Sequence, residues 1–242
     1  MNILFVSEPL FPTPGSLDGT ASRTLNLARA LERRGHNVYV LTLRESPDAP
    51  LEEFYDKCRI IRFEKGVYPL KFYRQRRKVY LGFVLKGKIF PFYAKIMKLI
   101  STHSIDILYC SNYLPSLTGI VFRKFIRVPI VCDLQTSLFP EAWLRGDYIE
   151  SIIGRMIEKM VFDFADAVTV PVPEYKEYAS KIYGQSVERC YVVPSCVDIH
   201  QFSPHTSAKN RGNLGLPLKD YLVFFHGTPY PENFRALEKL IQ

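Results

Sequence analysis

The sequence has few of the features that mark membrane-spanning, secreted or metal-binding proteins. None of its 242 residues lie in a run of the roughly 18 uncharged apolar residues that a spanning helix needs. The first apolar run is short, lacks a basic flank and meets Pro9, unlike a secretory signal peptide. No Asp-x-Asp, His-Glu-x-x-His or His/Cys cluster occurs, so we expect no metal site. With 47% apolar and 23% charged residues, the composition predicts a soluble globular protein.

Cysteine is scarce and irregularly spaced. The five cysteines are odd in number and form no C-x-x-C pair; they are Cys58, Cys110, Cys132, Cys190 and Cys196. Four of them sit in apolar runs, where a reduced thiol packs as a small hydrophobic group. We therefore expect reduced cysteines and a cytoplasmic protein.

The G-x-G-x-x-G fingerprint and the Walker lysine are also missing, although the chain opens as strand, loop, helix and strand. Apolar runs at 2–7 and 37–43 flank a helical pattern at 20–34, in which Arg23 falls off the apolar stripe. The loop ends at Gly19-Thr20, where the start of the helix favours an anion or a sugar hydroxyl. A plain turn is the alternative reading of this loop.

The rest of the chain alternates between strand and helix patterns. Further strands are predicted near 58–63, 106–110, 129–134, 167–171 and 190–193, and further helices near 86–101, 148–165 and 174–183. Such alternation is typical of α/β proteins with a doubly wound, mainly parallel sheet covered on both faces.

Several motifs resemble glycosyltransferase family 4, whose members have the GT-B fold. Seven residues separate Gly19 from Leu27-Ala28, and Arg34-Gly35-His36-Asn37-Val38 follows, as in that family. The segments VPIVCDLQTSLFPEAW, EKMVFDFADAVTVPVPEYKEYASKIYG and VERCYVVPSCVDIHQFSP are similar to later motifs of the family, in the same order. Asp18 replaces the first glycine of the family loop, and a carboxylate there would repel a donor diphosphate.

The resemblance implies a Rossmann-like amino-terminal, acceptor-side domain over 1–205 and a linker over 206–220. Residues 221–242 resemble the first strand, glycine loop and helix of the family's carboxy-terminal, donor-side domain, where Gly227 would border the donor site. The rest of that domain is missing, with its diphosphate-binding and paired-glutamate positions. We therefore expect this chain alone to be inactive and assign no catalytic residue. A complementary polypeptide is one way to supply the rest of the donor-side domain.

The implied activity is transfer of a sugar from a nucleotide-sugar donor to a glycan or lipid-linked acceptor hydroxyl, as in polysaccharide biosynthesis. The reaction is expected to retain configuration and to need neither metal nor resident cofactor, because helix termini and basic side chains stabilise the leaving diphosphate. The alternatives are a non-catalytic module that binds an acceptor, a membrane or a subunit, and another nucleotide-binding Rossmann enzyme. The sugar, the base and the acceptor do not follow from the sequence.

Polar residues follow two predicted strands at the edge where open α/β sheets bind ligands. Asn112 follows one strand, and Gln135, Thr136 and Glu141 follow the strand that ends near Asp133. We expect these residues, with Gly19 and Thr20, to bind donor or acceptor; hydrogen bonding within the loops is the alternative. A glycosidase-like pair of Asp133 and Glu141 is disfavoured, because their separation is not fixed by the sequence.

Acidic residues are absent between Lys65 and Lys98, where ten Lys and Arg lie among aromatic residues. The whole chain has a net charge of +8 and this tract carries +10, so the residues outside the tract have a net charge of −2. Such a tract suits an anionic membrane surface, here the inner leaflet, and we assign this role to Arg74, Arg76, Arg77 and Lys78. A solvated basic helix pair is the alternative. Nucleic acid is disfavoured, because no reader motif accompanies the tract.

Overall fold

The computed structural model describes residues 1–7, 19–44, 47–67, 89–196, 211–217, 221 and 238–239, with the side chains of 65–67 and 185–187 excepted. The strands are β1 (Asn2–Ser7), β2 (Asn37–Arg44), β3 (Glu52–Tyr55), β4 (Cys58–Val67), β5 (Ile107–Ser111), β6 (Ile130–Asp133), β7 (Ala167–Val170) and β8 (Cys190–Val192). The helices are α1 (Gly19–Arg33), α3 (Ile89–Thr102), α4 (Tyr113–Val121), α5 (Leu138–Leu144), α6 (Tyr148–Phe164) and α7 (Pro173–Tyr183), followed by a 3₁₀ helix at Gly184–Arg189.

All eight strands form one sheet in the order β3-β4-β2-β1-β5-β6-β7-β8. Every neighbouring pair is parallel except β3 and β4, which form an antiparallel hairpin. The structure thus confirms the predicted α/β fold with a mainly parallel sheet. The sequence did not reveal β3, because its four residues Glu-Glu-Phe-Tyr show no apolar alternation.

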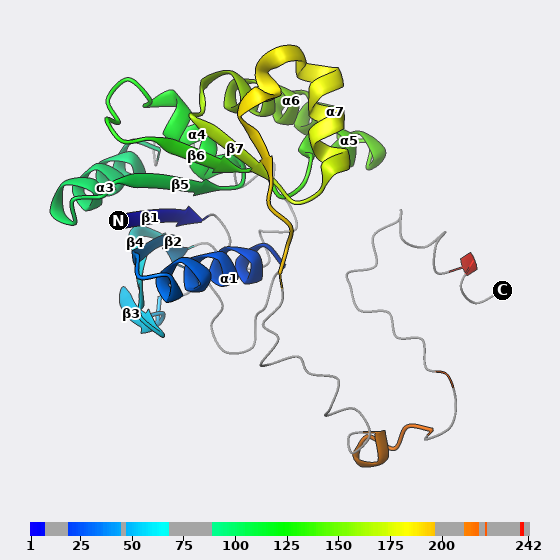
Figure 1. Cartoon of the computed structure of the whole chain (residues 1–242), viewed down its shortest axis with the longest axis horizontal. Helices are drawn as coiled ribbons and strands as arrows, with labels where there is room; N and C mark the ends of the chain where they lie inside the picture. Colours follow the sequence, from blue (N-terminus) through cyan, green and yellow to red (C-terminus); the bar gives the residue numbers. More distant parts are fainter. Residues whose placement is uncertain are drawn as a thin grey trace.

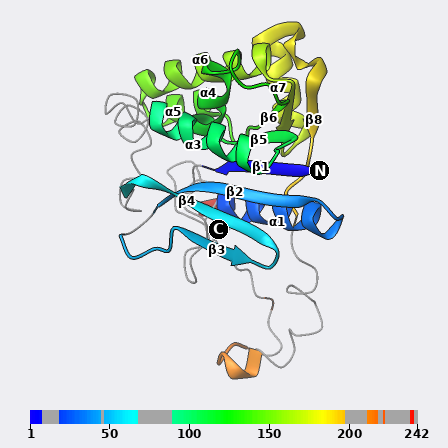
Figure 2. The same ribbon diagram turned by 90° about the vertical axis from the view of Figure 1, so that its left-hand side faces the viewer.

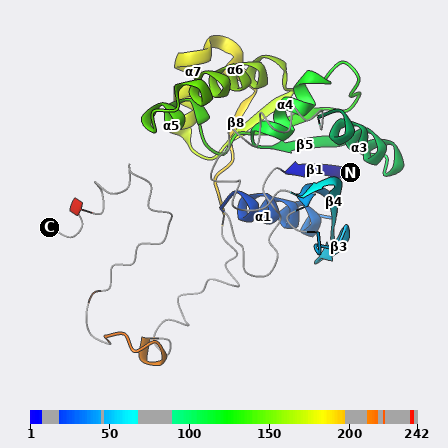
Figure 3. The same cartoon turned by 180° about the vertical axis from the view of Figure 1, so that it is seen from behind.

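Helices cover both faces of the sheet, as a doubly wound fold requires (Figures 1 and 2). Alternate residues of β1 point to opposite sides: Ile3 and Phe5 pack with Leu25 and Ala28 of α1. Leu4 and Val6 belong to the larger core, to which α3, α4, α5, α6 and α7 contribute. The view from behind shows these helices together on one side and α1 on the other (Figure 3).

Two helices, α4 and α5, were not predicted from the sequence. Helix α4 contains Pro115 and Gly119, both of which weaken a helical pattern. Pro115 is tolerated because it lies in the first turn, where backbone N–H groups have no intrahelical acceptor. Gly119 allows close packing on β5, since a Cβ there would lie 3.1 Å from Cys110 Sγ. Helix α5 has seven residues, too few to show a helical period.

The direction of the strand order reverses at β1, which pairs with β2 on one side and β5 on the other. Ligands of open α/β proteins bind at such a switch point, beyond the carboxyl ends of the strands. Here these ends carry polar side chains that are buried: Ser7 on β1, Ser111 on β5, Asp133 on β6 and Thr169 on β7. This carboxyl edge of the sheet is the candidate site.

Several predictions concern residues outside the described part of the chain. They include Gly227, the basic residues Arg74, Arg76, Arg77 and Lys78, most of the linker 206–220 and most of 221–242. Among the described residues, no helix is both long enough and apolar enough to cross a membrane. All five cysteines are free, and Cys196 is exposed while the other four are buried.

Candidate functional site

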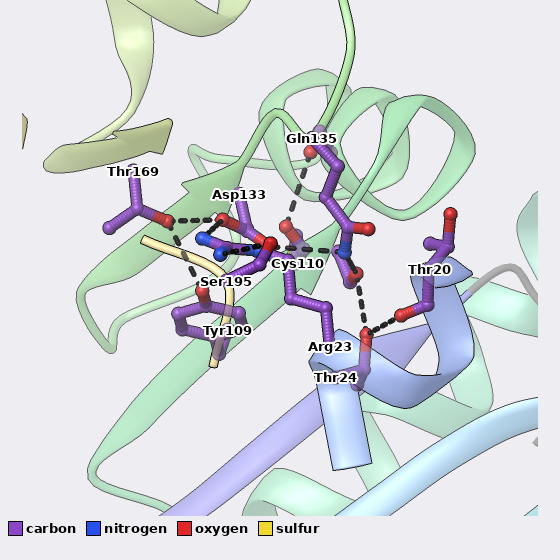
Figure 4. A network of polar contacts seen from close by, with 11 residues as sticks. Thr20, Arg23, Thr24, Tyr109, Cys110, Asp133, Gln135, Thr169 and Ser195 are labelled. Atoms are coloured by element: carbon purple, nitrogen blue, oxygen red, sulfur yellow. Dashed lines mark hydrogen bonds and ion pairs between the residues drawn. The ribbon is translucent and has the colours of Figure 1, made fainter. Parts of the chain in front are cut away.

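A buried ion pair between Arg23 and Asp133 lies at the centre of the carboxyl edge (Figure 4). Arg23 Nε donates to Asp133 Oδ2 at 3.0 Å, and Nη2 donates to Oδ1 at 2.9 Å. This two-pronged contact joins α1 to the end of β6. The side chains are only 3% and 0% exposed, so the pair is shielded from water and from screening by salt.

Further donors complete the coordination of the Asp133 carboxylate. Thr169 Oγ1 donates to Oδ1 at 2.7 Å, and Gln135 Nε2 donates to Oδ2 at 3.1 Å. Burial opposes the charge on Arg23, but hydrogen bonding and attraction to Asp133 outweigh it and raise the pKa of the guanidinium. The sequence placed Arg23 off the apolar stripe of its helix, and the structure shows it buried there against Asp133.

A chain of hydrogen bonds connects Gln135 to the first turn of α1. Gln135 Nε2 also donates to Ser111 Oγ at 3.0 Å, and that hydroxyl lies 2.9 Å from Thr24 Oγ1. Thr24 in turn donates to the Thr20 carbonyl at 3.0 Å. The structure therefore connects two of the residues singled out in the sequence, Gln135 and Thr20, through Ser111 and Thr24.

Asn112 and Ser7 offer polar atoms that the described residues leave unused. The side-chain Oδ1 of Asn112 and Oγ of Ser7 are buried without a hydrogen-bond partner. The backbone of Asn112 has φ of 68°, and its N–H donates to the Asp133 carbonyl at 2.9 Å. A buried polar atom without a partner is costly, so Asn112 and Ser7 mark a place on the sheet edge that requires a further polar group.

Gly19 begins α1 at the same edge. A Cβ at this position would meet no described atom within 4 Å, so glycine is not needed for packing there. The first turn of a helix presents free N–H groups and the positive end of the helix dipole. No described atom lies within 4 Å of a Cβ at Gly19, so the described part of the chain does not cover the start of α1 on that side.

A second buried carboxylate, Glu158 of α6, supports the loop that follows β6. It accepts from Leu138 N at 2.8 Å, and the hydroxyls of Tyr113, Tyr183 and Ser137 lie 2.5, 2.8 and 3.1 Å from its oxygens. Burial raises the pKa of Glu158, although these four donors lower it in part. The sequence does not reveal the role of Glu158, because a glutamate within an amphipathic helix gives no sign of burial.

Thr136 belongs to this second cluster. Its carbonyl accepts from the hydroxyls of Tyr113 and Tyr175 at 2.8 and 3.1 Å, which holds the loop between Gln135 and α5 in place. Glu141 lies farther along α5, where it is half-buried and 3.8 Å from Arg145.

The segment beyond β8 is attached to this edge by α1. Arg23 Nη1 donates to Ser195 Oγ at 3.3 Å, and Asn26 Nδ2 donates to the Cys196 carbonyl at 3.1 Å. The same arginine therefore contacts the carboxyl end of β6 and the chain that leaves the sheet.

The chemistry of this edge favours polar, hydroxyl-rich ligands. Within the network that surrounds Asp133, the charge of Arg23 is already matched by the carboxylate. The remaining groups are hydroxyls and amides, which exchange hydrogen bonds with sugar hydroxyls in both directions. Asp133 is fully buried and each of its oxygens accepts two hydrogen bonds, which makes it unsuited to act as a nucleophile.

Comparisons with known proteins identify the family of the chain. The chain is 26% identical over 228 residues to a D-inositol 3-phosphate glycosyltransferase of Xylanimonas cellulosilytica, covering 89% of this chain and 52% of that protein. A similar enzyme of Kineococcus radiotolerans is also 26% identical, over 91% of this chain and 50% of its own length. The chain thus spans about half the length of the curated relatives it matches.

Solved structures share the fold. Sucrose-phosphate synthase from Thermosynechococcus elongatus superposes with a TM-score of 0.72 at 18% identity, over 89% of this chain and 53% of that one. HepE of Anabaena, in complex with UDP and glucose, gives a TM-score of 0.62 at 18% identity, over 99% and 57%. The model of Glycosyltransferase Family 4 matches residues 17–201. By this match over most of its length, the chain belongs to Glycosyltransferase Family 4.

Proposed function

We propose that the chain forms the acceptor-side half of an enzyme that transfers a sugar from a nucleotide-sugar donor to an acceptor hydroxyl. The observation that carries the proposal is the carboxyl edge, where hydroxyl and amide groups surround an ion pair that is already neutral as a whole. Such an edge recognises a sugar or polyol better than a diphosphate. The complexes of HepE with UDP and with UDP-glucose support a nucleotide-sugar donor.

In this proposal, Gln135, Thr136 and Glu141 bind the acceptor, together with Asn112. The orientation of the Gln135 amide is set by Ser111 and Asp133, which leaves its oxygen available to a ligand hydroxyl. Gly19 and Thr20 lie at the start of α1 and contact donor phosphate or acceptor. Gly227, outside the described residues, borders the donor.

We further propose that transfer retains configuration and uses neither a metal nor a resident cofactor. The leaving diphosphate then depends on helix N-termini and basic side chains for electrostatic stabilisation. Within the carboxyl edge, α1 supplies one such helix terminus. The cation that grips the diphosphate is expected from outside this edge, because Arg23 is engaged with Asp133.

The basic tract points to a lipid-linked acceptor and to peripheral association with the inner membrane face, as in polysaccharide assembly. In this proposal, Arg74, Arg76, Arg77 and Lys78 attract anionic lipid headgroups. Replacing all four by Glu should abolish binding to anionic vesicles, and equal binding by wild type and variant would contradict it.

Ligand binding to the 242-residue chain tests the proposed acceptor site. Saturation-transfer NMR with a panel of mono- and oligosaccharides, inositol phosphate and UDP-glucose should identify an acceptor-type ligand. Gln135→Ala should weaken the binding of that ligand by about tenfold, as expected for losing a hydrogen bond at a polar site. Asn37→Ala is the matched control, because Asn37 is an exposed amide at the start of β2, bonded to Asn2. Equal binding by both variants, or no carbohydrate binding at all, would overturn the proposal.

A further inference from the structure

Positive charge dominates the part of the chain that runs from α3 to β6. Between Ile89 and Cys132 the sequence has five Lys and Arg and a single acid, Asp106. Lys95 pairs with Glu64, and Arg123 pairs with Asp166. Lys124 and Arg127 are exposed, and no ion pair engages them among the described residues.

Large apolar side chains are exposed at the same place. Phe90 at the start of α3 and Phe125 after α4 are each 65% exposed, and Val121 is 49% exposed. Buried Phe122 joins them: its ring centroid lies 5.5 Å from that of Phe90, and its carbonyl accepts from Phe125 N at 2.9 Å. We call Phe90, Val121, Lys124, Phe125 and Arg127 the α3–α4 patch.

The environment of the α3–α4 patch differs from that of the other exposed apolar surface. Leu144 and Ile152 on α5 and α6 are 74% and 58% exposed. Charges of both signs accompany that surface, which we call the α5–α6 surface: Arg145 lies 3.8 Å from Glu141 and 3.5 Å from Glu150, and Asp147 caps α6. The α3–α4 patch contains cations and no acidic residue, so an anionic partner finds net complementary charge there.

We propose that the α3–α4 patch docks the protein onto an anionic lipid bilayer. Phe90 and Phe125 enter the boundary between headgroups and acyl chains, while Lys124 and Arg127 contact lipid phosphates. The inference deepens the membrane association proposed above and rests on it, but it assigns the contact to different residues. Aromatic rings beside unpaired cations are the combination that interfacial binding uses, and acidic side chains that would repel headgroups are not part of the patch.

The position of the patch is compatible with an open site. Helix α4 begins after Asn112 at the carboxyl edge and ends at Val121 in the patch. Its nine residues place the two ends roughly 13 Å apart. A bilayer that contacts the patch therefore leaves Gln135 and the start of α1 free for ligands.

Vesicle co-sedimentation of the 242-residue chain tests this inference. Wild type should bind phosphatidylcholine vesicles that contain phosphatidylglycerol, and should not bind vesicles of phosphatidylcholine alone. Lys124→Glu/Arg127→Glu should weaken binding by about 25-fold or more, because two favourable charges become repulsive. Phe90→Ser/Phe125→Ser should weaken it by about tenfold or more and make the remaining binding more sensitive to salt.

Leu144→Ser/Ile152→Ser is the matched control, since it removes exposed apolar groups from the α5–α6 surface, and it should bind as wild type. Thermal melting checks that each variant is folded, and Phe125→Ser alone serves if the double variant melts early. If the wild-type chain does not bind anionic vesicles, the proposed membrane association itself is wrong. If wild type binds and both patch variants bind equally well, the inference about the patch is wrong and the association stands. If only the control variant loses binding, the inference about the α3–α4 patch is also wrong.

Discussion

The two buried carboxylates, Asp133 and Glu158, illustrate two ways to keep an acid inside a protein. Asp133 faces a guanidinium, and opposite charges meet in a two-pronged contact. Glu158 is surrounded by tyrosine and serine hydroxyls and a backbone N–H, with no cation bonded to it among the described residues. The Asp133 arrangement is stable only when both charged partners are present. Around Glu158, several neutral donors together stabilise the buried carboxyl group.

The difference matches the positions of the two groups. Asp133 lies at the carboxyl edge, where Arg23 also holds the outgoing segment at Ser195. Glu158 lies behind this edge and fixes the loop over Thr136–Leu138. We infer that the ion pair sets the site's geometry, while the hydroxyl cluster responds to pH through the raised pKa of Glu158.

Asp133→Ala should have the largest effect, because it leaves the Arg23 charge buried without its partner. We expect a loss of about 3–5 kcal/mol in the free energy of unfolding, measured by urea denaturation. The double variant Arg23→Met/Asp133→Leu should lose less than Asp133→Ala, since both charges are then removed. A double variant at least as unstable as the single one would show that the pair contributes through packing instead.

Glu158→Gln should cost less, about 1–3 kcal/mol, because several neutral donors can rearrange. The cost should also depend on pH. The pKa of Glu158 is raised by burial, so above an unfolded carboxyl pKa of about 4.3 the unfolded chain releases this proton first. Stability from Glu158 is thus greatest in acid and falls as pH rises, by at most about 1.4 kcal/mol per pH unit.

Urea denaturation of wild type and Glu158→Gln at pH 4.5 and pH 7 measures this dependence. The difference between the two proteins should shrink at the higher pH, because glutamine does not titrate. A difference that grows with pH would mean that the cluster stabilises the ionised form.

Tyr183→Phe should have a smaller effect again. It removes one hydroxyl that donates to Glu158 Oε2 at 2.8 Å and leaves the ring stacked on Phe162. We expect about 0.5–1.5 kcal/mol in the free energy of unfolding. Losing a donor should also raise the pKa of Glu158 further, which carboxyl NMR titration detects. An unchanged titration would indicate that Ser137 and Tyr113 alone define the cluster.

Gly19→Ala should change stability least, and in the favourable direction. The added Cβ meets open space, so we expect a gain of up to about 1 kcal/mol from the reduced freedom of the unfolded chain. Ligand binding at the start of α1 should nevertheless weaken in the NMR experiment. A lower free energy of unfolding in Gly19→Ala would mean that neighbouring residues already occupy the space that the added Cβ enters.

The sequence predicted the elements whose patterns are local. Parallel strands such as β1 and β6 read as apolar runs because both faces are buried, and α6 shows an amphipathic period over seventeen residues. Short α5 and the charged strand β3 lack such patterns, so their conformation depends on contacts with α6 and β4. Patterns within a segment carry no information about such partners.

The same limit applies to the site. Gln135 and Asn112 could be placed at the carboxyl edge from the sequence because they follow strands, and carboxyl ends of parallel strands share one edge. The pairing of Arg23 with Asp133 joins residues 110 positions apart, and no local rule connects them. One signal was available: an aspartate that closes the apolar strand Ile130–Asp133 needs a partner when buried. Which of the many basic residues supplies it depends on the fold.

Cys196 offers a natural attachment point for a reporter. It is the one exposed thiol of the five, and it directly follows Ser195, which Arg23 contacts, while its own carbonyl is held by Asn26. A maleimide dye or nitroxide can therefore be placed there without engineering any other cysteine. The rotational freedom of that label reports whether the contacts of α1 with Ser195 and Cys196 are intact. A change in these contacts on ligand binding would therefore alter the fluorescence or spin-resonance spectrum.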